Sequence, residues 1–449
     1  MTAVATPSTA HQAPAGSVAP APTSGSALRP VTSTLVALRR RRAALIVLAL
    51  LFGVAGAFTV QQRGSGTHDA VAHSGPLTVQ AEKLYHSLSD ADATAATAFL
   101  SVGTEPPELR AKYIGDLAAA SAALTTATSE AAGDKQSALA LATIAQQLPL
   151  YTGEIESARA NNLQGLPIGP RYLNQASQLM QGTILQAAND LATAEAANLA
   201  AAGKKSTSIP YLEIAAGLAV LLALLAVQRA ESGRTHRTVN PALLAATAAV
   251  LVSVLWMAGA FALETGQVHQ AEKNGSAQVA VLAAARIESL RARSDEMLTL
   301  VARGSAPADE TKFAQTDEPA TASSLASATS RATDVQGRAL AQKAVTDEAA
   351  WKTAHADLHA LDNANDYVGA LRSALGATAK SGGASANTDF QLLQTDLDAA
   401  ITGARARFHS HSTSADDALF GAAAGMALLA LAVAAAVSVG LGRRIAEYR

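Results

Sequence analysis

The stretch that decides the fold is LFGAAAGMALLALAVAAAVSVGL, Leu419–Leu441, which runs for 23 residues without a charge. A helix of about 20 apolar residues crosses the hydrocarbon core of a membrane and satisfies its own backbone hydrogen bonds there. Three more stretches share this character: Ala43–Val60, Ile209–Val227 and Pro241–Leu263. Their one charged residue, Glu213, stands about one turn from a helix end, so we expect its carboxylate to reach the membrane surface. The sequence therefore predicts four transmembrane helices.

The spacing of these spans separates long connections from short ones. Residues 61–208 and 264–418 form two long excursions, whereas residues 228–240 form a short loop. Residues 1–42 precede the first span, and residues 442–449 follow the last. With four spans, both excursions lie on one side of the membrane, and the short loop and both termini lie on the other.

Arginines favour the side of the short loop. They stand beside the first span, in the loop and after the last span: Arg39–Arg42, Arg229, Arg234, Arg237, Arg443 and Arg444. The positive-inside rule then predicts a multi-pass protein of the cell membrane with both termini cytoplasmic. A cleaved signal peptide is the alternative for the first span, but 42 preceding residues are long for its charged region, which favours an uncleaved anchor.

Composition sets the fold class of the excursions. Alanine is abundant and only 4% of residues are aromatic, which favours helix over strand. The chain has no cysteine, which excludes disulfides and thiolate metal sites. The net charge of −2 and the lack of a basic patch indicate no nucleic-acid partner. We expect an all-α membrane protein.

Within this class the breaks define two helical bundles. Residues 1–42 are predicted to be a disordered cytoplasmic tail, because their Ala, Pro, Ser and Thr show no apolar period. A linker over 61–76 should precede the first bundle. HSHSTS at 409–414 should break the last helix before the fourth span. Amphipathic helices joined by short turns in each excursion predict two extracytoplasmic four-helix bundles, over 61–208 and 264–418.

The two halves of the chain also align loosely. Ser87-Leu88 and Ser289-Leu290 occupy similar places, as do Lys112-Tyr113 and Lys312-Phe313. We expect a tandem duplication of span, bundle and span. The alternative is chance, because alanine-rich helices align with one another easily.

No chemistry-bearing motif stands out. His355 and His359 are one helical turn apart, but Ala356 stands where a zincin needs Glu, so a solvated helix face is the better interpretation. Nucleophile elbows and kinase signatures are missing. We therefore predict no catalytic residue, cofactor or metal site, and no enzyme.

Small residues in the spans predict close helix packing. Gly421 and Gly425 form a GxxxG step, and Gly53 with Ala57 forms a small-xxx-small step. Such steps also arise from alanine and glycine background alone. Packing through these small-residue steps would allow a homo-oligomer within the lipid bilayer.

This organisation resembles the GlnX membrane proteins of actinobacteria, with four spans, two helical ectodomains and a minimal cytoplasmic face. The residues that carry the resemblance are Tyr151, Ala158-Arg159, Asn161, Pro167, Gly169, Tyr172-Leu173, Ala176-Ser177, Trp351, His355, Leu361-Asp362, Asp366, Phe390, Phe408 and the closing Arg443–Arg449. The resemblance implies a signal transducer. Its extracytoplasmic partner would be a GlnH-like solute-binding lipoprotein loaded with aspartate or glutamate, and its cytoplasmic partner a PknG-like serine/threonine kinase.

Two other classes of protein fit the same sequence. One is a cell-envelope scaffold whose bundles only hold partners. The other is an accessory subunit of a transport system, although the spans lack the polar groups and broken helices of a transport site. On the transducer hypothesis, Arg229, Arg234, Arg237, Arg443 and Arg444 are the candidates that face the kinase.

Overall fold

The computed structural model describes residues 31–69, 75–101, 105–131, 134–206, 210–235, 240–302, 307–376 and 385–447. All regular elements in these ranges are helices, which confirms the predicted all-α class. Pro107, Pro241 and Pro307 each stand at the first position of a helix. The missing N–H of proline is harmless there, because the first N–H groups of a helix have no partner within it.

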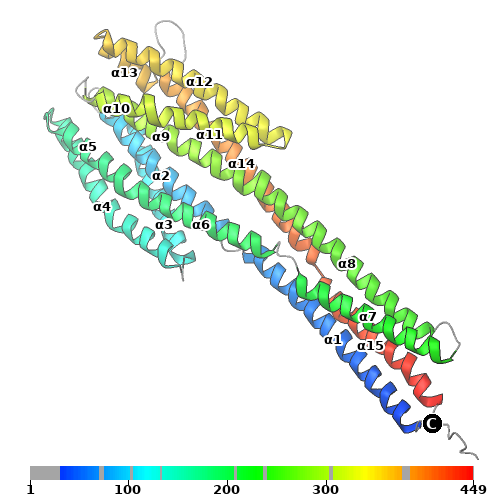
Figure 1. Ribbon diagram of the computed structural model, residues 1–449. Coiled ribbons are helices and arrows are strands. Elements are labelled where there is room, and N and C mark those ends of the chain that lie inside the picture. Colours follow the sequence, from blue (N-terminus) through cyan, green and yellow to red (C-terminus); the bar gives the residue numbers. More distant parts are fainter. Residues whose placement is uncertain are drawn as a thin grey trace, which may run out of the picture.

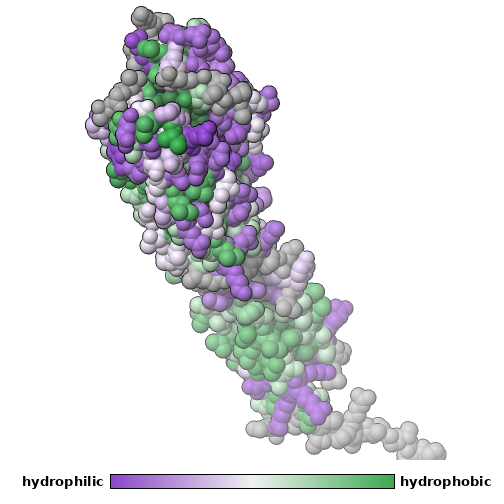
Figure 2. Space-filling view, turned by 90° about the vertical axis from the view of Figure 1, so that its left-hand side faces the viewer, coloured by the Kyte–Doolittle hydropathy of each residue, from purple (hydrophilic) through white to green (hydrophobic). Residues whose placement is uncertain are grey.

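Four helices form a slender bundle at one end of the molecule (Figure 1): α1 (Val31–Asp69), α7 (Tyr211–Thr235), α8 (Pro241–Ala271) and α15 (Ala422–Glu447). α15 packs against both α1 and α8, and α7 closes the ring. Each contains a stretch long and apolar enough to cross a membrane. A broad hydrophobic band covers this part of the surface (Figure 2). These helices are the four expected spans.

The other end of the molecule holds two groups of helices. The first group comprises α2 (Gly75–Phe99), α3 (Pro107–Glu130), α4 (Lys135–Leu163), α5 (Gly169–Leu179), the π-helical turn η2 (Met180–Ile184) and α6 (Leu185–Ser206). The second comprises the π-helical turn η3 (Glu272–Ser276), α9 (Ala277–Ala302), α10 (Pro307–Lys312), the π-helical turn η4 (Phe313–Asp317), α11 (Glu318–Arg331), α12 (Val335–Asn363), α13 (Tyr367–Leu375) and α14 (Ala386–Leu419). We use the name ectodomain for these helices outside the membrane bundle, and we call the two groups its first and second half.

The two halves share their cores. α2 and α9 lie side by side in the middle of the ectodomain (Figure 1). Leu298 of α9 belongs to the apolar core of the first half, while Ala96 and Leu100 belong to that of the second. The two expected bundles are therefore joined along α2 and α9 into one packed unit.

The halves also repeat each other. α4 and α12 are both 29 residues long and begin 200 positions apart, at Lys135 and Val335. Asp134 and Asp334 cap them by accepting hydrogen bonds from the first backbone N–H groups. A left-handed residue follows two positions after the last residue of each helix, Gly165 with φ 65° and Asn365 with φ 62°. This correspondence agrees with the expected tandem duplication.

Three expected breaks are continuous helix instead. Residues 31–42, placed in the tail, form the start of α1, and residues 61–69, placed in a linker, form its end. HSHSTS lies inside α14, where the Ser414 hydroxyl donates to the Ser410 carbonyl and His411 contacts the Gln267 side chain at 2.8 Å. α8, η3 and α9 follow one another without a gap from 241 to 302. Residues 1–30 lie outside the described residues.

The three packing glycines occupy different environments. A Cβ at Gly53 would collide with Ala430 of α15, and one at Gly425 would collide with the Trp256 ring of α8. Gly421 instead lies between α14 and α15 with φ 73°, and no atom lies within 4 Å of its Cβ position. Its requirement for glycine is therefore one of backbone conformation, not of helix contact.

We predict that Gly53→Leu and Gly425→Leu each destabilise the membrane bundle by about 1–3 kcal/mol, because the added side chain forces two helices apart. Thermal unfolding of the detergent-solubilised chain measures the effect. Gly259→Leu is the matched control, since Gly259 is an exposed glycine of α8 with open space at its Cβ. Equal loss in all three variants would contradict the assigned contacts.

Candidate functional site

The candidate site is the polar interior of the ectodomain, where α2 and α9 meet. Residues 91–98 of α2 and 292–300 of α9 are buried on every side. Helices in that position are usually apolar all round. These two instead bury a set of polar side chains: Asp92, Thr94, Thr97, Arg293, Ser294, Asp295, Glu296 and Thr299. Burial of a polar group is costly where the group has no partner, so the partners of these side chains decide how the region packs.

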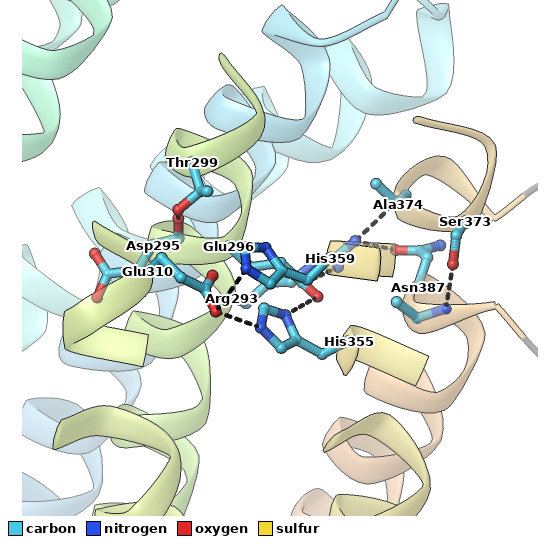
Figure 3. Close-up of polar contacts among 11 residues, drawn as sticks. Arg293, Asp295, Glu296, Thr299, Glu310, His355, His359, Ser373, Ala374 and Asn387 are labelled. Carbon is cyan, nitrogen blue, oxygen red and sulfur yellow. Dashed lines mark hydrogen bonds and ion pairs between the residues drawn. The ribbon is translucent and has the colours of Figure 1, made fainter. Parts of the chain in front are cut away.

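Arg293 is the centre of the first of two polar clusters (Figure 3). Its guanidinium, 2% exposed, is paired with Glu296 one turn along α9. It also donates to the Ala374 carbonyl at 2.7 Å and to the Asn387 side chain at 3.0 Å. The cluster thus ties α9 to the end of α13 and the start of α14.

His355 of α12 completes this cluster. Its Nδ1 lies 2.9 Å from Glu296 Oε1, and its Nε2 lies 3.4 Å from Glu310 Oε1. Burial lowers the pKa of His355, but the hydrogen bonds and charges of Glu296 and Glu310 outweigh burial and raise it to about 9. His355 is therefore an imidazolium at neutral pH, and two cations face two carboxylates.

Aromatic rings seal the cluster. The Phe313 ring stacks on His355 with centroids 3.5 Å apart, and it meets the Trp351 ring edge-on at 5.5 Å. The Phe390 ring lies 5.1 Å from Trp351 and 5.4 Å from the Arg293 guanidinium carbon. By excluding water, these rings strengthen the charged contacts beneath them.

Asp92 of α2 is the centre of the second cluster. Its carboxylate accepts hydrogen bonds from the Ser177 hydroxyl at 2.8 Å, the Ser294 hydroxyl at 3.1 Å and the Tyr151 hydroxyl at 3.4 Å. Burial raises the pKa of Asp92, and these hydrogen bonds oppose the rise. Ser294 follows Arg293 on α9, so this one helix takes part in both clusters. It therefore fixes how each half is aligned along α9.

A charged contact also holds two helices of the membrane bundle together at the end that faces the ectodomain. Arg63 of α1 and Glu264 of α8 form an ion pair in which both side chains are almost fully buried. The Arg63 guanidinium carbon lies 4.3 Å from the Phe261 ring centre. Glu213 of α7, expected at the membrane surface, is buried beside Gly56 of α1 instead. The Arg63–Glu264 pair and Glu213 lie at the ends of the spans that face the ectodomain. We call this region the neck.

The predicted arginines lie at the opposite end of the membrane bundle. Arg229 and Arg443 are exposed, on α7 and α15. Arg234 and Arg444 are on the same helices, but their side chains, and all of Arg237, lie outside the described residues.

Sequence reasoning missed the two polar clusters. His355, expected on a solvated face, is buried because Glu296 and Glu310 pair with it. The available signal was the run Arg293–Glu296, four polar residues inside an apolar helical pattern. Among the described residues, no group of three or more His, Cys, Asp or Glu side chains is placed to hold a metal ion.

Comparison with known proteins finds a match for part of the chain. Residues 66–204 match the family described as the actinobacterial sensor domain. These residues are therefore similar to an actinobacterial sensor domain. The match covers α2 to α6, the first half of the ectodomain, and about a third of the chain. No curated protein and no solved structure matches the chain.

We predict that His355 gives the ectodomain a pH-dependent stability. Because the pKa is raised from 6.5 to about 9, its contribution is complete below pH 6.5 and is lost as pH rises through 9. The loss should be on the order of 3 kcal/mol. Thermal unfolding of the full chain between pH 6 and 10 should therefore show a slope that His355→Gln flattens.

His359→Gln is the matched control for this experiment. The His359 side chain is 35% exposed and contacts only Glu310, at 3.8 Å, among the ion pairs of the described residues. That variant should keep the slope of the parent chain. An unchanged slope in His355→Gln would contradict the buried imidazolium.

Proposed function

We propose that this chain is a non-enzymatic transmembrane signal transducer. It receives an amino-acid signal of the aspartate or glutamate type from an extracytoplasmic solute-binding lipoprotein and relays it to a cytoplasmic serine/threonine kinase. The observation that carries the proposal is the unbroken path from the polar interior to the membrane. α9 continues through η3 into α8, so a movement at Arg293 is passed directly to a membrane-crossing helix.

Three features support a relay over a passive scaffold. The sensor match lies in the half that faces α9 through Asp92 and Ser294. The polar side chains of both clusters have specific partners. The ectodomain helices should therefore change between two packed arrangements and not deform continuously. The neck pairs Arg63 of the first half of the chain with Glu264 of the second, which couples the halves again at the membrane.

The distal tip of the first half offers a docking surface for the lipoprotein. Leu163, Leu166 and Ile168 surround the turn between α4 and α5, and each is at least 43% exposed. Aliphatic side chains gathered on a surface are typical of protein contacts. The arginines at the far end, Arg229, Arg234, Arg237, Arg443 and Arg444, are the proposed contacts of the kinase.

Copurification tests the proposed partners. We expect the intact chain to recover a solute-binding lipoprotein and a serine/threonine kinase from its native membrane and cytosol. Arg234→Lys with Arg237→Lys should keep insertion but reduce kinase recovery, because lysine keeps the charge and loses the planar fork that binds carboxylates. Leu166→Asp should reduce lipoprotein recovery and leave the kinase unaffected. Recovery of neither partner by the parent chain would favour the scaffold.

Cysteine labelling tests the orientation in the membrane. The chain has no native cysteine, so single substitutions give clean signals. In intact cells, cysteines at the exposed positions Ser129 and Ser330 should react with an impermeant reagent. A cysteine at Ser232, near the end of α7, should react only after the membrane is permeabilised. Reaction of position 232 in intact cells would reverse the proposed topology.

A further inference from the structure

Three pairs of acidic side chains lie between elements of the second half. The pairs are Asp295 with Asp317, Glu318 with Glu348, and Asp347 with Asp396. They join α9 to η4, α11 to α12, and α12 to α14. Neighbouring carboxylates repel each other, so three such pairs in one group of helices need a physical explanation.

Asp295 is the most deeply buried of these residues. It directly precedes Glu296 on α9 (Figure 3) and is 1% exposed. Both of its carboxyl oxygens are buried and have no hydrogen-bond donor among the described residues. The groups that face it are the Asp317 carboxyl at the end of η4 and the ion pair of Asp309 and Lys312 on α10, 3.5 Å apart. Because Lys312 is already paired, an ionised Asp295 would stand beside Asp317 without a cation of its own.

α12 carries the other two pairs on two of its flanks. On the first flank Glu348 faces Glu318 of α11, and both side chains are buried. Lys352, one turn along α12, donates to Glu318 at 2.6 Å. Oε1 of Glu348 is buried and has no donor among the described residues. One lysine therefore stands against two carboxyl groups.

The second flank of α12 repeats this arrangement towards α14. Asp347 faces Asp396, and Lys343, one turn back along α12, donates to Asp396 at 2.5 Å. One oxygen of each carboxyl group, Oδ2, is buried and accepts from no donor in the described part of the chain. Asp389 of α14 adds a further negative charge near Asp347. Again one lysine stands against an excess of carboxyl groups.

A shared proton accounts for all three pairs. Two carboxylates can only accept hydrogen bonds, whereas a carboxylic acid donates one to the carboxylate beside it. The unpartnered oxygens have almost no accessible surface, so they offer room for a proton and not for a larger ligand. Burial, and then the neighbouring carboxylate, raise the pKa of Asp295 to about 8, that of Glu348 to about 7 and that of Asp347 to about 6.

We propose that the second half of the ectodomain is a proton-binding unit that responds to the acidity of its surroundings. With a proton bound in each of the three pairs, η4, α11, α12 and α14 pack firmly against one another and against α9. Loss of these protons leaves like charges face to face and loosens the same contacts. The response needs neither the lipoprotein nor the kinase, so its failure would not affect the proposed relay, nor would failure of the relay affect it.

Infrared spectroscopy of the full-length chain in nanodiscs tests for the bound protons, because a protonated carboxyl group has a carbonyl stretch that a carboxylate lacks. We expect this signal at pH 6 and a weaker one at pH 10. Asp295→Asn with Glu348→Gln should remove part of the signal at pH 6, since both groups hold a proton there. An equal signal in the folded variant and in the parent chain overturns the proposal.

Thermal unfolding between pH 5 and pH 6.5 tests the effect on stability. The contribution of His355 is complete in this range and adds no slope. The folded pairs keep protons that the unfolded chain loses, so they make stability fall as pH rises. Asp295→Asn, Asp347→Asn and Glu348→Gln together replace these acids by amides, which donate without a proton to lose. The melting temperature of this triple variant relative to the parent chain should therefore rise by at least about 5 °C from pH 5 to pH 6.5.

Asp357→Asn is the matched control, because Asp357 is an exposed carboxylate of the same helix, α12. Its melting temperature relative to the parent chain should stay constant over this range. Asp347→Asn alone keeps the test decisive if the triple variant does not fold, since Asp347 is only half-buried, and its relative melting temperature should rise with pH. A constant value in the folded triple variant, or in Asp347→Asn where the triple variant does not fold, overturns the proposal.

Discussion

The ectodomain depends on one constraint, the burial of the Arg293 guanidinium. Arginine stays charged in proteins, so this group must find its partners inside. Even after relaxation, a buried ion costs several kcal/mol unless its contacts offset the loss of water. Glu296, the Ala374 carbonyl and Asn387 supply those contacts from three helices. Glu296 lies on α9 itself, so the rest of the second half can close around α9 only in the register that brings Ala374 and Asn387 to Arg293.

The same constraint extends to the first half through α9. Ser294 reaches Asp92 from the residue directly after Arg293, so a sliding or turning of α9 that keeps one cluster breaks the other. Apolar helix contacts tolerate small shifts at little cost, whereas a buried carboxylate that loses its donors does not. α2 and α9 are thus held as a pair by polar contacts, while the surrounding alanines and leucines provide the bulk of the packing.

Sequence patterns were sufficient for some levels of this structure and not for others. Long charge-free stretches and alanine-rich composition predicted the spans and the all-α class, because both depend on local chemistry. The burial of Arg293 and Glu296 was not predictable, since two opposite charges three residues apart are typical of a solvated helix face. The same ambiguity hid His355, whose burial depends on where Glu296 and Glu310 are brought by other helices.

Sequence signals for a helix break were wrong where the segment packs against a neighbouring helix or its side chains hydrogen-bond within the helix. HSHSTS remains helical in α14, where its hydroxyls bond to carbonyls one turn back and His411 reaches Gln267 of α8. Gly421 and Gly425 look equivalent in a GxxxG step. The structure separates them, one by a left-handed backbone and the other by the Trp256 ring. Which glycine serves which purpose depends on the neighbouring helix, which a single sequence does not reveal.

The two membrane connections of the second half are mechanically different. α9 passes into α8 through the π-helical turn η3, where the Arg407 side chain donates to the Asn274 carbonyl and Gly275 lets Phe408 of α14 approach the backbone. That turn is packed, so α8 and α9 move together. α14 meets α15 at Phe420 and the left-handed Gly421, where the helix is interrupted and no side chain lies close to Gly421. In the proposed relay, a displacement of the second half would therefore be carried by α8, whereas the Gly421 break would let α15 keep its position against α1. Relative movement of α8 past α15 is the change that this proposal predicts at the far side of the membrane.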